Sequence, residues 1–372
     1  MRKAGEYQKL GDMNYFIPFS LPPIDPPLHL NAAMLELCME ASFALGQLNE
    51  ISIQLPDYKR FVRGYVIREA MLSSAIEGIH TTLAEVFTAS LTGSKASKST
   101  QLVNNYSQAI DTALEMTQQQ GLPVATRVIL KAHEVLMSAG DGDKSAPGQF
   151  RQQTVRVGEL VPPPAPRVAG LIGDLERYIN DVHDIPPLIK AGLAHVQFET
   201  IHPFLDGNGR IGRMLIVLML INSGLLTLPT IYPSHYFKKH HLEYYQRLDR
   251  VRSHGDFEGW ITYYLAAIKE SAQEAYKRGR DITRLYNQLN HFVQTADDFS
   301  KMRITAMDVV DALFAQPITT ITEISKATEK AYNTVHKTLQ CLKSHNLVAE
   351  MPINERHKLY HFTPYLKILQ IE

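Results

Sequence analysis

Residues 201–213, near the middle of the chain (IHPFLDGNGRIGR), combine residue types that bind and transfer phosphates. His202 can accept a proton from an attacking hydroxyl, because an imidazole titrates near neutral pH. Asp206 can hold a magnesium ion, which typically takes one or two carboxylates together with substrate oxygens and water. Each residue alone is more often an ordinary loop residue. Together with the neighbouring glycines and arginines they indicate a nucleotide site.

The glycines of this stretch lead into an apolar segment, residues 214–221, that is followed by Gly224. We expect a helix from about Arg210 towards Gly224, because a glycine commonly ends a helix. A Gly-Asn-Gly run takes positive φ without steric cost, so its N–H groups can turn towards one anion at the helix start. Arg210 and Arg213 share a face there. Two cations at a helix N-terminus are favourable when a phosphate lies between them.

The stretch also resembles the motif of the Fic family, HPFxxGNGRxxR with Asp or Glu at the second variable position, and every position is filled. The resemblance implies an enzyme that transfers AMP from ATP to a hydroxyl side chain of a protein and releases pyrophosphate. His202 would then be the base, Asp206 the magnesium ligand, and the arginines the partners of the β- and γ-phosphates. Glycine at position 209 favours AMP transfer, since the phosphorylating Doc-type relatives carry a bulkier or basic residue there. The residues implied to bind ATP are His202, Gly207, Asn208, Gly209, Arg210, Ile211, Gly212 and Arg213, with Glu77 and Tyr244 from elsewhere in the chain.

A second motif, Ser73-Ser-Ala-Ile-Glu77-Gly78, ends a helix that we expect over residues 57–77. It resembles the inhibitory motif of autoregulated Fic proteins, Ser/Thr-x-x-x-Glu-Gly/Asn. Ser73 and Glu77 are four residues apart and share a helix face, and a carboxylate at a helix C-terminus needs a nearby cation. The resemblance implies that Glu77 pairs with Arg213 in the place of the γ-phosphate and so inhibits transfer. Two alternatives stay open: an exposed glutamate at a helix end, or a residue that positions water for AMP removal.

Residues 148–161 are predicted to form a hairpin that opens with Gly-Gln-Phe-Arg and turns at Gly158-Glu159. In the Fic family the corresponding flap holds the backbone of the target protein by strand addition. A surface hairpin without a partner is the alternative. Farther along, Tyr244 resembles the family position that packs on adenine, with Tyr245 as the second choice and a core role open for either.

Length and composition describe an ordinary globular protein of two or three domains: 372 residues, 45% hydrophobic and 20% charged. A net charge of zero gives no general attraction to nucleic acid or to anionic membranes. Cys38 and Cys341 lack metal or redox spacing and fit a reducing compartment. The longest apolar run is far shorter than the ~20 residues of a membrane span. No signal peptide begins the chain. We therefore expect a cytoplasmic protein without a membrane anchor.

Helical periodicity predominates, so a mainly α fold is expected, and the resemblance implies a Fic-fold helical bundle with a hairpin flap. Residues 1–100 would hold a proline-rich extended arm (1–27) and the inhibitory helix. Residues 101–255 would form the catalytic core, and residues 256–300 a linking helix with a break near Gly279. Further helices are expected over 28–54, 101–119, 125–138, 168–183, 186–200 and 235–250, and loops over 90–100 and 140–148.

Residues 301–372 follow a different pattern, with three helices and then two strands at 347–351 and 358–362 around a turn at 352–356. This order resembles a winged helix-turn-helix domain. Between residues 317 and 363, six Lys or Arg stand against four Asp or Glu, which is weak support for DNA binding. Contact with another protein, or a homodimer, is at least as well supported. For the whole chain, the alternatives are a nucleotide-sensing DNA-binding transcriptional regulator, or a Fic variant that removes AMP or acts as a kinase.

Overall fold

The computed structural model describes residues 2–54, 58–89, 91, 96–138, 145–182, 184–352 and 358–369. The loops predicted at 90–100 and 140–148 and the turn predicted at 352–356 lie partly outside these residues. None of the helices in the described ranges has the length and hydropathy needed to cross a bilayer.

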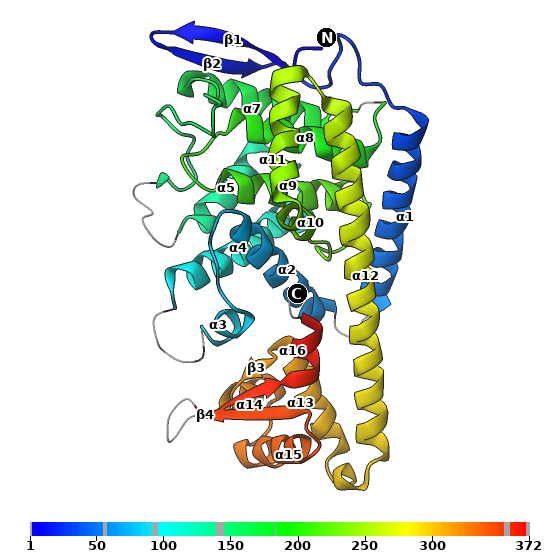
Figure 1. Cartoon of the computed structure of the whole chain (residues 1–372). Helices are drawn as coiled ribbons and strands as arrows, with labels where there is room; N and C mark the ends of the chain where they lie inside the picture. The colour runs from blue at the N-terminus through cyan, green and yellow to red at the C-terminus, as the bar shows by residue number, and fades with distance from the viewer. Residues whose placement is uncertain are drawn as a thin grey trace.

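Helices dominate the fold, as predicted, and most form one body at the upper part of Figure 1. Two long helices, α1 and α12, lie side by side along one edge of this body, and α12 continues to the C-terminal elements. No break interrupts α12 at Gly279, which packs against Ile51 and Tyr65. The helices are α1 Ala32–Gln54, α2 Tyr58–Ile76, α3 Leu83–Thr88, α4 Lys98–Leu114 with a π-helical turn at Glu115–Gln119, α5 Thr126–Leu136, α7 Ala165–Asn180, α8 Pro187–Ile201, α9 Asn208–Asn222, α10 Ser234–Lys239, α11 His241–His254 and α12 Phe257–Thr295.

Helices α8 and α9 form the centre of this body and hold the motif between them. Both are buried on nearly every side, which is typical of a helix surrounded by other helices. Ile216, Val217 and Leu220 of α9 have no exposed surface at all. The loop at 202–207 is therefore anchored at both ends by buried helices. Such an anchor fixes the positions of its side chains.

Helix α2 passes between the body and the C-terminal elements, so it touches both. The Tyr65 hydroxyl donates to the carbonyl of Ala275 in α12 at 3.0 Å. Arg68 donates at 3.1 Å to the carbonyl of Leu369, in the last helix α16 (Thr363–Leu369). The helix that carries the proposed inhibitory residues is thus tied to the far end of the chain.

The N-terminal segment is not the extended arm that we predicted. Residues 5–18 form an antiparallel hairpin, β1 (Gly5–Leu10) and β2 (Met13–Pro18). Gly11 has a φ of 61°, and the two-residue Gly-Asp loop that it begins is a hairpin signal in the sequence. The high proline content of the following residues concealed this signal.

The C-terminal elements contain the three predicted helices and two predicted strands: α13 Arg303–Ala315, α14 Ile321–Thr328, α15 Tyr332–Ser344, β4 Val348–Pro352 and β5 Lys358–Phe362. A short strand, β3 (Ile318–Thr319), and α16 were not predicted. The sheet is antiparallel with the order β3-β5-β4. The Thr320 hydroxyl caps α14 by accepting from the Glu323 N–H, as the capping-box pattern indicated.

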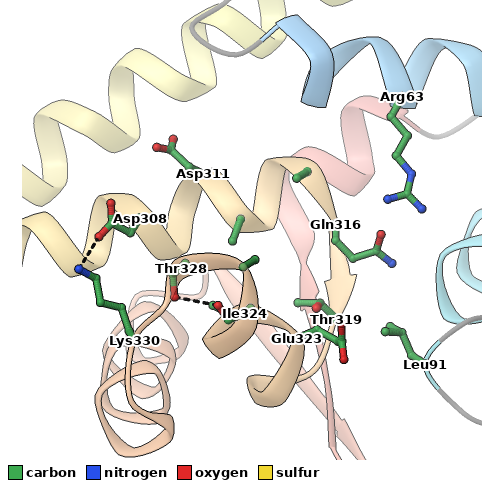
Figure 2. A pocket seen from close by; sticks show the side chains of 13 residues that line it. Arg63, Leu91, Asp308, Asp311, Gln316, Thr319, Glu323, Ile324, Thr328 and Lys330 are labelled. Carbon is green, nitrogen blue, oxygen red and sulfur yellow. Dashed lines mark hydrogen bonds and ion pairs between the residues drawn. The ribbon is translucent and has the colours of Figure 1, made fainter. Parts of the chain in front are cut away.

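A cavity of about 630 Å³ lies where α2 faces α13 and α14 (Figure 2). Arg63 lines it from α2, while Asp308 and Lys330 line it from the C-terminal elements and pair at 3.2 Å. The two parts of the chain therefore meet at this point across a polar space.

Candidate active site

The residue predicted to be the base, His202, ends helix α8 in a left-handed conformation. Its φ of 50° and ψ of 63° are unusual for a residue other than glycine, and neighbouring groups must stabilise them. Arg151 provides that support: its side chain donates to the carbonyl of His202 at 2.8 Å, and its N–H donates to the carbonyl of Pro203 at 2.9 Å. Arg151 is buried although it is charged, and its guanidinium also donates to the carbonyls of Gln153 and Pro163, so it connects this turn to the flap segment.

The imidazole of His202 is half-buried, and its Nδ1 is buried without a hydrogen-bond partner among the described residues. Burial lowers the pKa of His202 to about 4, and the positive charges of Arg252 and Arg151 act in the same direction. The ring is therefore neutral at physiological pH. The neutral form is the protonation state that a general base requires.

Asp206 and Gly207 form the exposed corner of the same loop. The Asp206 side chain is 63% exposed, and its Oδ1 accepts from the Gly207 N–H at 2.6 Å and lies 3.5 Å from Arg210. Among the described residues no group donates to its other oxygen, Oδ2. A magnesium ion that takes its remaining ligands from phosphates and water fits this single, accessible carboxylate.

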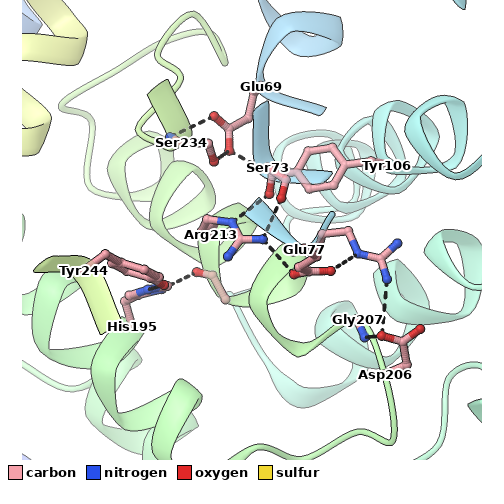
Figure 3. A network of polar contacts seen from close by, with 12 residues as sticks. Glu69, Ser73, Glu77, Tyr106, His195, Asp206, Gly207, Arg213, Ser234 and Tyr244 are labelled. Atoms are coloured by element: carbon pink, nitrogen blue, oxygen red, sulfur yellow. Dashed lines mark hydrogen bonds and ion pairs between the residues drawn. The ribbon is translucent and has the colours of Figure 1, made fainter. Parts of the chain in front are cut away.

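Arg210 and Arg213 both point to one carboxylate, that of Glu77. Arg210 Nε lies 2.7 Å from Glu77 Oε2, and Arg213 Nη2 lies 2.7 Å from Oε1. Figure 3 shows Glu77 and Ser73 directed at Arg213, whose guanidinium donates to the Ser73 hydroxyl at 2.8 Å and carbonyl at 2.9 Å. The predicted contact with Arg213 is present. The second contact, with Arg210, was not predicted.

An anion thus occupies the start of helix α9, and the chain itself supplies it. Gly207 is the N-cap with a φ of 79°, and the first N–H groups of the helix have no intrahelical partner. A Cβ atom at Gly209 would come within 2.6 Å of Glu77 Oε1 and 2.7 Å of Arg213 Nη1, so only glycine leaves room for the ion pairs. Two arginines and a helix N-terminus around one carboxylate are also what a phosphate group needs.

Comparison with known proteins connects this geometry to a family. Residues 123–220 match the model of the Fic/DOC family, and residues 35–115 match that of the Fic/DOC family N-terminal region. The chain contains a Fic/DOC family domain.

Curated relatives of this Fic domain include the protein adenylyltransferase Fic of Drosophila erecta, 32% identical over 159 residues. That alignment covers 42% of this chain and 30% of the fly protein, so the chain spans about a third of the length of the curated relatives it matches. Among solved structures, a Fic family protein from Desulfovibrio desulfuricans G20 aligns with 91% of this chain and 98% of its own, at 23% identity and a TM-score of 0.57. Fic-1 from C. elegans aligns with 68% of this chain and 74% of its own, at 20% identity and a TM-score of 0.53. These two likenesses show the Fic fold.

Three motif residues of the Fic domain face the protein core, so only their backbone atoms can approach a nucleotide. Asn208 closes the loop through its side chain, which accepts from the Phe204 N–H at 2.8 Å and donates to the Phe204 carbonyl at 2.9 Å. Ile211 is buried in the core. The Gly212 carbonyl accepts a hydrogen bond from His195 Nδ1 at 2.8 Å.

Tyr244 is a core residue, and the prediction that it packs on adenine is therefore not supported. Only 1% of it is exposed, its hydroxyl bonds to His195 Nε2 at 2.8 Å, and its ring lies 4.8 Å from that of Phe237. Tyr245, the second choice, is 44% exposed. His195 received no chemical role from the sequence, and its two hydrogen bonds and complete burial agree with a structural one.

The flap of the Fic domain is shorter than predicted. Residues 154–161 contain a single bridge, between Val157 and Leu160, instead of two strands. The neighbouring N-terminal hairpin supports it: the Phe16 N–H donates to the Val161 carbonyl at 2.9 Å, and the Tyr15 hydroxyl lies 3.0 Å from that of Thr154. The chain's own strand β2 therefore occupies part of the edge that a hairpin flap would offer.

Two buried glutamates near Arg213 were missed by the sequence analysis. Glu69 accepts hydrogen bonds from the Ser234 hydroxyl and the Tyr106 hydroxyl, and burial raises its pKa to about 7 (Figure 3). Glu199 lies in the last turn of α8, and burial raises its pKa to about 7 as well. Burial on its own would lower the pKa of Arg213, but Glu77, Tyr244, Glu199 and Tyr106 together outweigh it and raise that pKa. Because these partners come from α2 and α8, only the folded chain brings them together.

Proposed function

We propose that this chain is a protein adenylyltransferase, which transfers AMP from ATP to a Ser, Thr or Tyr hydroxyl of a target protein and of itself. The observation that carries the proposal is the carboxylate of Glu77 between Arg210 and Arg213 at the start of α9, because it marks an anion site beside a neutral imidazole. The curated relatives named adenylyltransferase support the same reaction.

In this proposal the triphosphate lies across the start of α9. The arginines and the first N–H groups of the helix hold the β- and γ-phosphates and stabilise the charge that develops on the leaving pyrophosphate. Mg²⁺ bound at Asp206 would neutralise phosphate oxygens. The backbone of residues 207–212 would follow the phosphate chain. Of the two tyrosines, Tyr245 is the better placed to pack on the adenine ring.

His202 acts on the acceptor. Its neutral imidazole takes the proton from the acceptor hydroxyl while the hydroxyl oxygen forms a bond to the α-phosphorus and the bond from that phosphorus to the β-phosphate oxygen breaks. Pyrophosphate leaves, and AMP remains on the target. The phosphates around the imidazole favour its protonated form, which raises its pKa from the low value of the free site. The flap at 148–161 would present the target's hydroxyl.

Glu77 inhibits the reaction in this proposal, because it occupies the place of the γ-phosphate on both arginines. A bound ATP would have to displace it or bind with the α-phosphorus turned away from the acceptor. Ser73 holds Arg213 in the orientation that receives Glu77. Gly78, with a φ of 77°, ends the helix directly after the inhibitory carboxylate and directs the chain away from the site.

Labelled ATP tests the function. We expect the Glu77→Gly variant to incorporate label from α-³²P-ATP, and none from γ-³²P-ATP, into itself or into added protein in the presence of Mg²⁺. Intact-mass analysis of the same sample should show the addition of one or more AMP groups. Transfer of the γ-label would indicate a kinase instead. Absence of any covalent product would favour a nucleotide-sensing regulator.

A further inference from the structure

His133 lies outside the motif, yet it contacts the motif loop at Phe204, Asp206 and Gly207. It occupies the last turn of α5 and is completely buried. Its ring stacks on that of Phe204 with centroids 3.7 Å apart and planes 4° from parallel. It also lies against the Cα of Gly207, where a Cβ atom would meet its ring at 3.6 Å.

Both nitrogens of this ring are engaged by backbone groups. Nδ1 lies 3.0 Å from the N–H of Gly148, at the opening of the flap, and Nε2 lies 3.0 Å from the carbonyl oxygen of Asp206. A carbonyl only accepts and an N–H only donates. The ring must therefore carry its proton on Nε2 and no proton on Nδ1. One side chain thus spans the flap opening and the residue proposed to hold magnesium.

Glycine at position 148 makes this bridge possible. Its φ is 69°, and a Cβ atom there would lie 3.0 Å from the Cβ of Glu134 and 3.3 Å from the carbonyl oxygen of Leu130. The flap opening therefore approaches α5 more closely than another residue type would allow. The contact of His133 with two separate loops is a built feature of the fold.

We propose that His133 is a positioning residue that fixes the Asp206 loop against the flap opening and thereby sets the affinity of the site for metal-bound nucleotide. This inference rests on the proposed function. A metal ligand such as Asp206 depends on the groups that orient its loop, and loss of such a group typically costs about 10–100-fold in metal affinity or activity. His133 takes no part in proton transfer, because both its nitrogens are already bonded.

Two substitutions separate its two contacts. In His133→Gln, the terminal amide nitrogen falls near the position of Nε2 and can still donate to the Asp206 carbonyl. In His133→Asn, the side-chain oxygen falls near the position of Nδ1 and can still accept from Gly148, but the bond to Asp206 is lost. Both are made in the Glu77→Gly variant, in which the site is open. Lys131→Ala, an exposed change on the same helix, is the matched control.

The binding readout uses Mn²⁺ in place of Mg²⁺, titrated in the presence of α,β-methylene-ATP and followed by electron paramagnetic resonance. We expect the Asn variant to bind Mn²⁺ about 10–100-fold more weakly than the parent and to lose kcat by a similar factor. The Gln variant should retain most of the affinity. Long-range ¹H–¹⁵N spectra of the parent should show His133 as the Nε2–H tautomer.

Equal Mn²⁺ affinity in the Asn variant and the parent would overturn the inference. So would equal losses in the Asn and Gln variants accompanied by an equal fall in melting temperature, since that pattern describes a packing role only. If the Glu77→Gly variant with His133 intact transfers no AMP, the proposed function fails. The Mn²⁺ affinities and the tautomer alone then decide the role of His133.

Discussion

The two ends of helix α2 contact the rest of the molecule in different ways. At its C-terminal end, Glu77 places one carboxylate between two arginines that are each about 1% exposed. Near its N-terminal end, exposed Arg63 faces a cavity of about 630 Å³, and the ion pair across from it joins Asp308 and Lys330, which are 38% and 35% exposed. At the C-terminal end the ion pairs are buried and two arginines share one carboxylate. At the N-terminal end the ion pair is exposed to solvent.

This difference indicates which end of α2 controls the activity of the site. A buried cation that loses its partner is costly, so the Glu77 contact holds the site closed until another anion replaces it. An exposed pair contributes little, because water and salt screen it. We therefore expect substitutions at the Glu77 end to change activity strongly, and substitutions at the cavity end to change it little.

The largest expected effect is at the base. His202→Ala in the Glu77→Gly background should lower AMP transfer by about 10²–10⁴-fold, the usual contribution of general-base catalysis. Labelled AMP on the protein measures it. His291→Ala, an exposed histidine of α12, is the control and should leave transfer unchanged. Near-normal transfer by the His202 variant would remove the proposed base.

Next is the inhibitory carboxylate. Glu77→Gly should raise AMP transfer by roughly 5- to 150-fold, the range that a coupling free energy of 1–3 kcal/mol produces. The same variant should unfold at a lower temperature, because Arg210 and Arg213 lose their shared partner, and ATP with Mg²⁺ should restore part of the loss. Glu40→Gly, at an exposed position of α1, controls for the glycine itself. An unchanged rate would show that Glu77 stabilises the fold without inhibiting the enzyme.

The sequence indicated the local parts of this arrangement more reliably than the long-range ones. The helix after the glycines follows from a short pattern, and the structure has it. The Glu77–Arg213 contact is also present, but it was implied by the resemblance to the Fic family. That Arg210 shares Glu77 was not predicted, because the resemblance implied a pair with Arg213 alone and no short pattern shows how the two arginines are oriented in the folded chain. A helical pattern places His133 on an apolar face, but it does not name the loops above that face.

The errors at the edge of the site have related causes. The flap pattern of alternating residues is too short to form a sheet by itself, and the folded chain places β2 against it instead. The hairpin at 5–18 was missed because the prolines after it suggested an extended arm. In both cases the outcome depends on a neighbour that is distant in sequence, and single-segment patterns contain no information about it.

A smaller effect is expected from Glu69, which lies on α2 between the two ends. Its pKa is raised to about 7 by burial, so the native state keeps a proton that the unfolded chain releases near pH 4.5. Its contribution to stability is complete below pH 4.5 and is lost as the pH rises towards 7, by roughly 3 kcal/mol in total. Glu69→Gln should therefore gain stability relative to the parent between pH 5 and pH 8. Urea unfolding followed by Trp260 fluorescence measures the gain, and Glu40→Gln should show none.

The smallest effect is expected at the cavity end. Lys330→Ala removes one partner of the exposed pair with Asp308, and such pairs contribute about 0.2–1 kcal/mol. We expect the free energy of unfolding to change by an amount within that range, and this change to become smaller in high salt. In the Glu77→Gly background, AMP transfer should equal that of the protein with Lys330 intact. A clear change in transfer would contradict the comparison. It would mean that the C-terminal elements act on the site through α2, since this helix contacts both the cavity and Arg213.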